Sequence, residues 1–420
     1  DDPAGFVFGE NEDQNVIKTG SYVGNNNANG PEVFLGFEPQ FIILKESSGS
    51  GQQWRMYDSM RGIVTGGNDA ELYPSSNISE DPDNEFLELT STGFKLKTTD
   101  DAVNDDGQTY IFLAIRRPDG YCGKIAELGT GVFTIDYGDG YSTIPNFPSP
   151  QFPVDFAFIK KWQDPSDWET SARLIQGKYL ELNDTAAESS GAGYTFDSNA
   201  GFDKSGKDAN WLGYMFKRHV GFDVVTYKGT GSNNTHNHSL NSTPQMMWVK
   251  RRDSTGNWYV YHVGLNDGSG PQNYFMQLDT ADDEQNAAIW NNAPTSSLFS
   301  VSSDSHVNTD TADYIAMLFA SVDGISKVGY YTGTASSNTI TTGFQPRFVF
   351  IKRTDDTGSW MVHDSKRGFT SGDDPYLRFN TDAAQSNFGV GTLISTGFIV
   401  STTDGSYNAS GGKYIYYAHA

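Results

Sequence analysis

The sequence predicts an all-β protein built from tandem antiparallel β-sandwich repeats of jelly-roll type. Three observations support this fold class. Several blocks of sequence recur in one order along the 420 residues. The composition, with 45 Gly, 22 Tyr and 27 Phe, suits short strands joined by tight turns. Long runs of the helix formers Ala, Leu, Glu and Lys are missing. A chain of this length fits three or four domains of common size.

The first and last copies of the repeat match in four blocks. Residues 36–45, GFEPQFIILK, align with residues 343–352, GFQPRFVFIK. The blocks DSMRG and DSKRG follow at 58–62 and 364–368, and STGF follows at 91–94 and 395–398. Both copies close on a Tyr-Ile strand that starts at Tyr110 or Tyr414. Four matched blocks in one order indicate duplication of a single unit.

Two weaker copies lie between them, and a tryptophan follows the strand lysine in every copy. The pairs are Lys45 and Trp54, Lys160 and Trp168, Lys250 and Trp258, and Lys352 and Trp360, at offsets of 9, 8, 8 and 8 residues. We therefore divide the chain into a lead segment, 1–17, and four β-sandwich repeats: segment 1 (18–120), segment 2 (121–221), segment 3 (222–324) and segment 4 (325–420). Segment 2 lacks the Asp-Ser-x-Arg-Gly block, so we interpret it as a degenerate copy that has lost a hairpin or loop.

Within each segment the Pro-led apolar run predicts a buried strand, and the tryptophan begins its antiparallel partner. The prolines suit the first residue of that strand, where no ladder donor is needed. We expect Trp54, Trp258 and Trp360 to be largely buried on the preceding strand. An asparagine stands six residues before the last strand in three copies, and we expect it to close a turn: Asn104, Asn308 and Asn408.

Charge and cysteine usage exclude several classes of function. The net charge of −23 repels phosphate backbones, so no nucleic-acid partner is expected. No apolar run is long enough for a membrane span, so no membrane insertion is expected. Cys122 is the only cysteine and cannot form an intrachain disulfide. We expect no cofactor; the acidic run 100–107 leaves Ca²⁺ as an alternative, although it departs from the EF-hand pattern.

No sequence pattern points to catalysis. The chain has no nucleophile elbow, phosphate-binding loop, dinucleotide fingerprint or zinc-protease motif, so no catalytic residue is assigned. The pairs Asp58 with Arg61 and Asp364 with Arg367 are interpreted as ion pairs that lock a turn. His236 and His238 have a spacing at which two imidazoles can share a metal, but they lie in a polar stretch without nearby Cys, Asp or Glu. No metal site is predicted there.

Two divergent loops are the candidate ligand or partner sites. Their side-chain amides and imidazoles can hydrogen-bond sugar hydroxyls or a neighbouring subunit, and both loops precede the Pro-led strand. They should therefore lie at the same end of their sandwiches. Trp162 and Trp290, which lie outside the repeated pattern, are alternative platforms for sugar stacking. The candidate loop residues are Asn25, Asn26, Asn27 and Asn29 in segment 1 and Asn233, Asn234, His236 and His238 in segment 3.

The recurring blocks resemble a repeat domain of virion proteins from tailed bacteriophages, notably marine and cyanobacterial ones. The resemblance is good over 18–120 and 325–420, partial over 222–324, and only in outline over 121–221. It implies a tail fibre, an appendage or a capsid decoration that serves particle assembly or host attachment. It further implies other virion proteins and host-surface glycans as partners, homo-oligomers, and a place on the extracellular particle after assembly in the host cytoplasm.

Two other function classes remain open. One is a carbohydrate-binding surface lectin outside any virion. The other is a glycan-degrading tailspike, because two carboxylates distant in sequence can meet in space to cleave a glycosidic bond. Repetition of a core without a repeated catalytic set favours the structural and adhesive interpretation.

Overall fold

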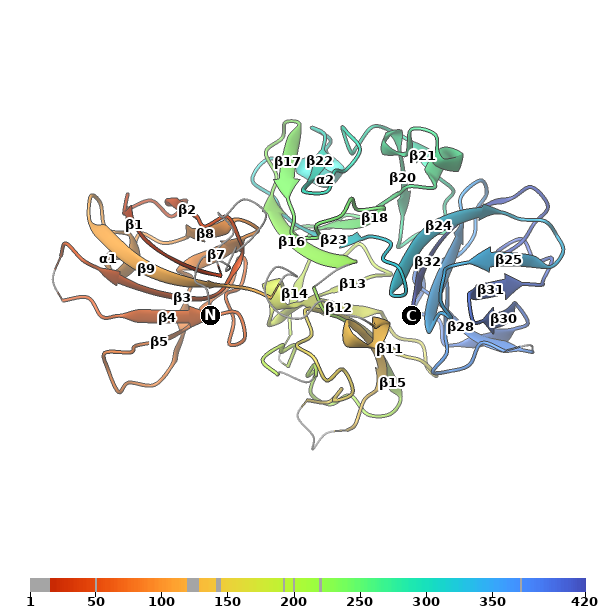
Figure 1. Cartoon of the computed structure of the whole chain (residues 1–420), viewed down its shortest axis with the longest axis horizontal. Helices are drawn as coiled ribbons and strands as arrows, with labels where there is room; N and C mark the ends of the chain where they lie inside the picture. The colour runs from red at the N-terminus through yellow and green to blue at the C-terminus, as the bar shows by residue number, and fades with distance from the viewer. Residues whose placement is uncertain are drawn as a thin grey trace, which may run out of the picture. The chain divides into compact units, whose positions relative to one another are not determined.

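The computed structural model describes residues 16–49, 51–118, 128–140, 145–191, 193–198, 201–218, 221–370 and 372–420. The fold is nearly all strand (Figure 1), and its α-helices in these ranges are α1 (Asp101–Asn104) and α2 (Ser305–Asn308). The predicted all-β class is therefore confirmed. Most of the predicted lead segment and Cys122 lie outside the described residues. Neither of the described α-helices is long enough to cross a bilayer.

Four six-stranded antiparallel sheets share one strand order, and one of them falls in each predicted segment. Sheet 1 runs β1 (Ile17–Val23), β9 (Thr109–Arg116), β3 (Pro39–Glu46), β4 (Arg55–Asp58), β5 (Asp69–Leu72), β6 (Asp81–Asn84). Sheet 2 runs β10 (Phe133–Tyr137), β15 (Trp211–Phe216), β11 (Phe156–Lys161), β12 (Glu169–Ala172), β13 (Lys178–Glu181), β14 (Ser189–Ser190). Sheet 3 runs β16 (Phe222–Lys228), β23 (Asp313–Phe319), β18 (Met246–Arg251), β19 (Trp258–His262), β20 (Tyr274–Gln277), β21 (Gln285–Asn286). Sheet 4 runs β24 (Ser326–Thr332), β32 (Lys413–His419), β26 (Phe348–Arg353), β27 (Met361–Asp364), β28 (Asp374–Arg378), β29 (Ser386–Phe388).

A second, smaller sheet completes the sandwich in three segments. Segment 1 has β2 (Glu32–Phe34), β8 (Gly93–Leu96) and β7 (Leu87–Thr90). Segment 3 has β17 (Asn234–Asn237) and β22 (Leu298–Val301). Segment 4 has β25 (Asn338–Thr341), β31 (Gly397–Val400) and β30 (Gly391–Ile394). In segment 2 the described residues contain no such sheet, only an isolated bridge between Phe147 and Phe202. The loss of a hairpin from a degenerate copy stays a prediction.

Apolar residues from both sheets form the core of each sandwich. In segment 4, Phe398 of the small sheet packs with Ile351 and Tyr416 of the large one. In three large sheets, a stacked tyrosine pair joins the edge strand that comes first in the chain to the neighbouring strand that comes last. The ring centroids are 5.0 to 5.1 Å apart: Tyr22 with Tyr110, Tyr227 with Tyr314, and Tyr331 with Tyr414. Gly329 lies opposite Tyr416, and a Cβ there would come within 2.5 Å of the tyrosine ring, so only glycine leaves room.

The positions predicted for the recurring proline and lysine are mostly confirmed. Pro39 is the first residue of β3, but Pro346 lies two residues before β26 begins. Each lysine is the next-to-last residue of its strand: Lys45, Lys160, Lys250 and Lys352.

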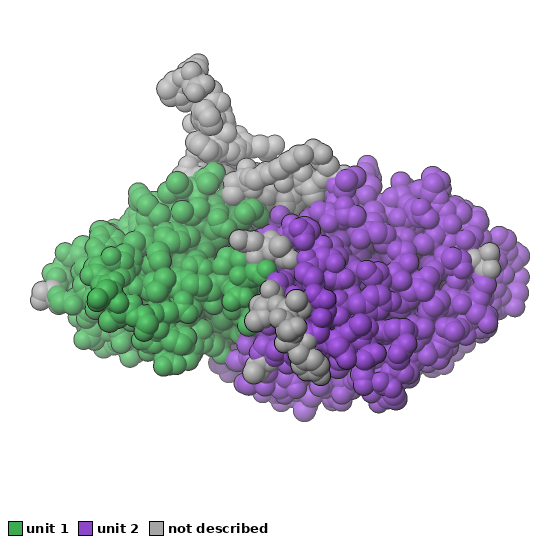
Figure 2. All heavy atoms as spheres, turned by 90° about the horizontal axis from the view of Figure 1, so that it is seen from below, with its two compact units in different colours: residues 1–125, 172–176, 195–198 green, residues 126–171, 177–194, 199–420 purple. Residues whose placement is uncertain are grey.

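The chain forms two compact units (Figure 2). Unit 1 contains segment 1 with residues 172–176 and 195–198 of segment 2. Unit 2 contains the rest of segment 2 with segments 3 and 4. Three of the four large sheets therefore pack together in unit 2.

Candidate functional site

The recurring tryptophans join segments 2, 3 and 4 to one another. The indole N–H of Trp168 donates to the carbonyl oxygen of Arg378 at 2.7 Å, in segment 4. Trp258 donates to Glu181 of segment 2 at 2.8 Å, and Trp360 donates to Gln277 of segment 3 at 2.9 Å. Three equivalent contacts thus lead from segment 2 to 4, from 4 to 3 and from 3 back to 2. We call this closed set the inter-segment ring.

The recurring lysines strengthen the same three joints. Lys160 donates from Nζ to the carbonyl oxygen of Asp382 at 2.7 Å, and Lys250 donates to that of Thr185 at 2.9 Å. Lys352 donates to that of Ala281 at 3.3 Å. Burial lowers the pKa of each of the three ammonium groups to about 8. A buried cation needs such acceptors, because an unpaired one is costly.

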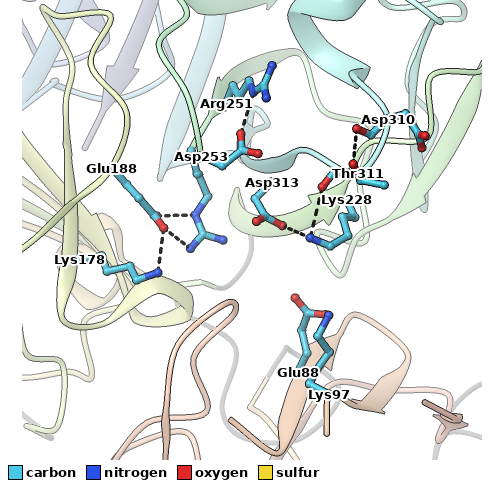
Figure 3. A network of polar contacts seen from close by, with 11 residues as sticks. Glu88, Lys97, Lys178, Glu188, Lys228, Arg251, Asp253, Asp310, Thr311 and Asp313 are labelled. Atoms are coloured by element: carbon cyan, nitrogen blue, oxygen red, sulfur yellow. Dashed lines mark hydrogen bonds and ion pairs between the residues drawn. The ribbon is translucent and has the colours of Figure 1, made fainter. Parts of the chain in front are cut away.

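Backbone and side-chain bonds complete each joint. The amide of Glu188 donates to the carbonyl oxygen of Arg252 at 2.7 Å, and Glu284 and Gln385 donate to Thr354 and Trp162 at 2.8 Å. The Glu188 carboxylate also accepts from the Arg252 guanidinium at 2.7 Å and from Lys178 at 2.9 Å, and Figure 3 shows Glu188 beside Lys178. Each joint therefore combines a tryptophan, a lysine and a backbone bond.

Aromatic side chains fill the centre of the ring. They come from the face of each large sheet that points away from its own sandwich core. Phe158 lies 6.4 Å from Trp248, and Trp248 lies 5.7 Å from Phe350, between ring centroids. All three are at most 1% exposed. This explains the continuous apolar runs of the strands, which are buried on both faces.

The prediction for the tryptophans was right for Trp258 and Trp360, which are fully buried, and wrong for Trp54, which is only partly buried. The physical reason is that much of the burial comes from a neighbouring segment. Segment 1 lies outside the ring, so Trp54 has no such neighbour among the described residues.

The recurring asparagines pin the loop that follows the first strand of the segment. The buried side chain of Asn104 accepts from the amide of Asn25 at 2.9 Å and donates to the carbonyl oxygens of Asn27 and Thr98 at 3.0 and 2.7 Å. Asn308 and Asn408 make the same three contacts in segments 3 and 4. These residues close turns, as predicted, and cross-link two loops.

The Asp-Arg pairs also have a structural arrangement. Arg61 donates from Nε to Asp58 at 2.6 Å, and Asp58 accepts the amide of Arg61 at 2.9 Å. Asp364 and Arg367 repeat this geometry at 2.6 and 2.8 Å, almost fully buried. Asp364 accepts in addition from the Tyr214 hydroxyl of segment 2 at 2.8 Å, which links the pair to the inter-segment ring.

The candidate asparagine loops occupy equivalent positions in their own sandwiches. The loop with Asn25, Asn26, Asn27 and Asn29 joins β1 to β2, and that with Asn233 joins β16 to β17. Asn25 and Asn27 each accept the amide two residues ahead, at 3.1 and 2.9 Å. Asn233 donates to Asn291 at 3.1 Å and accepts from Ser303 at 2.9 Å. Asn234 is the first residue of β17. Ligand binding by these loops stays a prediction.

The two histidines point into the protein. The His236 ring lies against the Tyr227 ring in a tilted arrangement, with ring centroids 4.1 Å apart, and burial lowers the pKa of His236 to about 4. His238 lies 3.1 Å through Nε2 from the carbonyl oxygen of Thr295 and accepts the amide of Leu240 on Nδ1 at 3.2 Å. Both nitrogens of His238 are therefore engaged, which removes it as a metal ligand in this conformation.

In the acidic run considered for Ca²⁺, two aspartates accept hydrogen bonds from nearby backbone amides. Asp100 caps α1 by accepting the amide of Ala102 at 2.8 Å, and Asp105 accepts that of Asp106 at 2.9 Å. Across the described ranges, no three His, Cys, Asp or Glu side chains converge as metal ligands. Calcium binding stays a prediction without a site.

A hollow in segment 4 is a candidate ligand site. Its volume is about 280 Å³, close to the lower end of ordinary ligand pockets. Phe388 stacks on Tyr407 with centroids 6.2 Å apart, and Arg378 donates to the Tyr376 hydroxyl at 2.7 Å. Aromatic faces beside a cation and a carboxylate suit a polar, ring-shaped ligand. The lining is completed by Ser359, Met361, Asp404 and Ser406.

Two comparisons bear on this arrangement. A family profile described as "Domain of unknown function (DUF7483)" matches residues 5–117 and 215–420, more than half of the chain. The chain belongs to this family. No curated protein matches the sequence. The DUF7483 match covers segments 1, 3 and 4 almost completely, and leaves out most of segment 2, the copy without the small sheet.

Sequence reasoning missed the hollow of this DUF7483 protein. Its residues come from three separate stretches, and the only signal available was that Tyr376, Arg378 and Phe388 stand outside the repeated blocks. The same signal misled for Trp290, which is fully buried and donates to the carbonyl oxygen of Tyr274 at 2.9 Å. Trp162 is partly exposed and donates to Ala209 at 3.3 Å.

Proposed function

We propose that this DUF7483 protein is a structural and adhesive component of a bacteriophage virion: a tail fibre, an appendage or a capsid decoration. The inter-segment ring carries the proposal. The residues that recur with the fold hold segments together or close turns, so the repeated feature is architecture. A rigid ring can present variable loops to a host surface, since loops can change without unfolding the sheets that carry them. The resemblance of the recurring blocks to phage virion repeats supports the same assignment.

Finding the chain on purified particles tests this proposal. Antibodies against the chain should label extracellular phage particles, and mass spectrometry of those particles should detect it beside other virion proteins. Soluble chain should compete with particles for adsorption if the component is adhesive. Recovery of the chain only from the soluble fraction of lysed hosts, with unlabelled particles, would contradict the virion assignment.

Our second proposal is that the protein binds host glycans, and the segment 4 hollow favours it. Tyr376, Phe388 and Tyr407 offer ring faces, and Arg378 and Asp404 offer a donor and an acceptor for sugar hydroxyls. Binding to a glycan array should fall about tenfold in Arg378→Gln, equal to about 1.4 kcal/mol. Arg251→Gln is the matched control, because Arg251 lies in segment 3, where it pairs with Asp253, and does not line the hollow. Equal binding by the two variants would remove the hollow as the site.

The same assay separates the remaining alternatives. Glycan binding by a chain that is absent from particles would favour a surface lectin. Release of oligosaccharides from host polysaccharide, lost when two neighbouring carboxylates are changed, would favour a glycan-degrading tailspike.

A further inference from the structure

Each contact of the inter-segment ring has a donor side, with a lysine and a tryptophan, and an acceptor side, with backbone carbonyl oxygens of the next segment. Segment 1 carries both sides, and within the described residues neither side contacts another segment in this way. Among the described residues, the one acceptor of the Lys45 ammonium group is the adjacent carbonyl oxygen, that of Glu46, at 2.7 Å. Trp54 is partly exposed, and its indole N–H makes no hydrogen bond within the described residues. On the other side of the joint, residues 74–80 are exposed, and Ile78 is 51% exposed.

One recurring hydrogen bond fixes which atoms of segment 1 are equivalent to those of the ring. The amide of Trp54 donates to Ser75 at 3.3 Å, as Trp168 donates to Asn183 at 2.7 Å and Trp258 to Asp279 at 2.9 Å. Counting from Ser75, the acceptor for a tryptophan indole is the carbonyl oxygen of Tyr73, and the acceptor for a lysine is that of Asn77. The amide of Glu80 and the carbonyl oxygen of Ser47 form the backbone pair. All four groups are present and in register.

The outer face of sheet 1 is apolar where the other sheets bury their aromatic centre. Strand pairing places Ile43 beside Leu113, and Ile115 beside both Phe41 and Ile17, all on this one face. Ile43 takes the position of Phe158, Trp248 and Phe350, which are at most 1% exposed. In segment 1 the same face is open: Ile43 and Leu113 are partly exposed, Ile111 is 40% exposed and Ile17 is 55% exposed. A contiguous apolar face of this kind marks an interaction site.

We propose that segment 1 from three copies of this chain closes a second ring, so that the protein is a homotrimer. Each copy gives Lys45 and Trp54 to one neighbour and the carbonyl oxygens of Asn77 and Tyr73 to the other. The number three follows from the joint itself: in segments 2 to 4 the same head-to-tail contact returns to its starting point after three steps. A heterologous contact that closes makes a ring rather than a filament.

The mass of the intact protein and its dependence on the apolar face test the trimer. Three copies of the 46.1 kDa chain should sediment as a species of about 138 kDa. The net charge of −23 per chain opposes association, so moderate salt should favour the trimer. Ile43→Asp and Trp54→Ala should each give a monomer that keeps its far-ultraviolet circular dichroism. Phe34→Asp is the matched control, because Phe34 is 69% exposed in β2, on the other sheet of the same segment; it should remain a trimer.

Cysteine cross-linking tests the head-to-tail geometry independently of those variants. Ser47→Cys with Glu80→Cys, in a Cys122→Ser background, places one thiol on each side of the joint. Oxidation should yield covalent species up to three chains, and neither single-cysteine variant should give a covalent trimer. Monomeric wild type at about 10 μM would overturn the proposal. So would a trimer unchanged by Ile43→Asp and Trp54→Ala, or cross-linking that stops at two chains.

Discussion

Acid should unfold unit 2 before unit 1, because the buried histidines lie in only one of the two. His262, His363 and His419 are almost fully buried, and burial lowers the pKa of each to about 3. Burial lowers the pKa of His236 to about 4. All four are in unit 2, whereas the residues of unit 1 include no histidine. An unfolded histidine titrates near 6.5, so below that pH the unfolded chain binds more protons and the free energy of unfolding falls.

The pKa values give the size of the effect. At pH 5, a histidine whose pKa falls from about 6.5 to about 3 costs about 2 kcal/mol of stability. Four such groups lower the free energy of unfolding of unit 2 by about 8 kcal/mol, against a typical domain stability of about 5–15 kcal/mol. Four carboxyl groups of unit 2 act in the opposite direction, because burial raises the pKa of Glu181, Glu284, Asp374 and Asp279. The pKa of Asp279 rises to about 6, which offsets about 1 kcal/mol. Unit 2 is therefore expected to lose most of its stability near pH 5.

Unit 1 should respond with the opposite sign. Burial raises the pKa of Asp69 to about 7, even though the carboxylate accepts three backbone amides at 2.7 to 3.1 Å. Between about pH 7 and the unfolded pKa near 3.8, the folded state binds the additional proton. Acidification from pH 8 to 5 therefore stabilises unit 1 by about 3 kcal/mol.

Urea unfolding at pH 8, 6 and 5, read by pulse proteolysis and peptide mapping, assigns each transition to a unit. The transition of unit 2 should move to lower urea as the pH falls, and that of unit 1 should not. His419→Phe should remove about 2 kcal/mol of the acid response, since the ring lies against Phe133 and Phe216. His306→Gln is the control, because the His306 side chain is 55% exposed. Parallel loss of both units, or an acid response unchanged by His419→Phe, would refute the reasoning.

Urea unfolding of three variants, two of them with a comparison variant, tests the structural roles of recurring residues. Trp360→Phe should lower the free energy of unfolding of unit 2 by about 1–3 kcal/mol, because it leaves the carbonyl oxygen of Gln277 without its indole donor. Trp162→Phe should lower it by less than half as much. Asn408→Asp removes the side-chain amide that donates to the carbonyl oxygens of Ser336 and Thr402. It should lower the free energy of unfolding by about 2 kcal/mol and speed hydrogen exchange in the loop that contains Ser336. Asp364→Asn should lower the free energy of unfolding by about 3–5 kcal/mol, because it leaves a buried guanidinium without its carboxylate. Asp58→Asn, in a pair whose side chains are 22% and 21% exposed, should lower it by about 1 kcal/mol.

The sequence was sufficient to predict the strands and the positions of the recurring lysines. Period and spacing determine which residues share a strand, and these are local properties. They do not determine what covers a strand's outer face. Trp54 and Trp360 stand in nearly the same sequence context, yet one is partly exposed and the other is fully buried. The difference comes from a neighbouring segment, and no pattern within one repeat encodes that neighbour.

The candidate ligand site was harder to predict for a related reason. Recurrence identifies structural residues well, as the Asn104, Asn308 and Asn408 pins illustrate. Departure from the repeat does not identify exposed ones. Trp290 departs from the repeat and is buried, while Phe388 departs from it and lines the hollow. Only the packing of the edge strands separates these two cases.

Segment 2 indicates which features of the repeat matter most for assembly. Its described residues form no small sheet and its sequence lacks the Asp-Ser-x-Arg-Gly block. It keeps Lys160, Trp168 and Glu188, and each of the three contacts another segment. A copy can therefore give up half of its sandwich as long as it retains the joint, because the ring supplies burial that its own core no longer does. Segment 1 retains both the full sandwich and the joint. Since its sandwich already buries a core, the partly exposed Trp54 and the open Ile43 face contribute most to stability when another copy covers them.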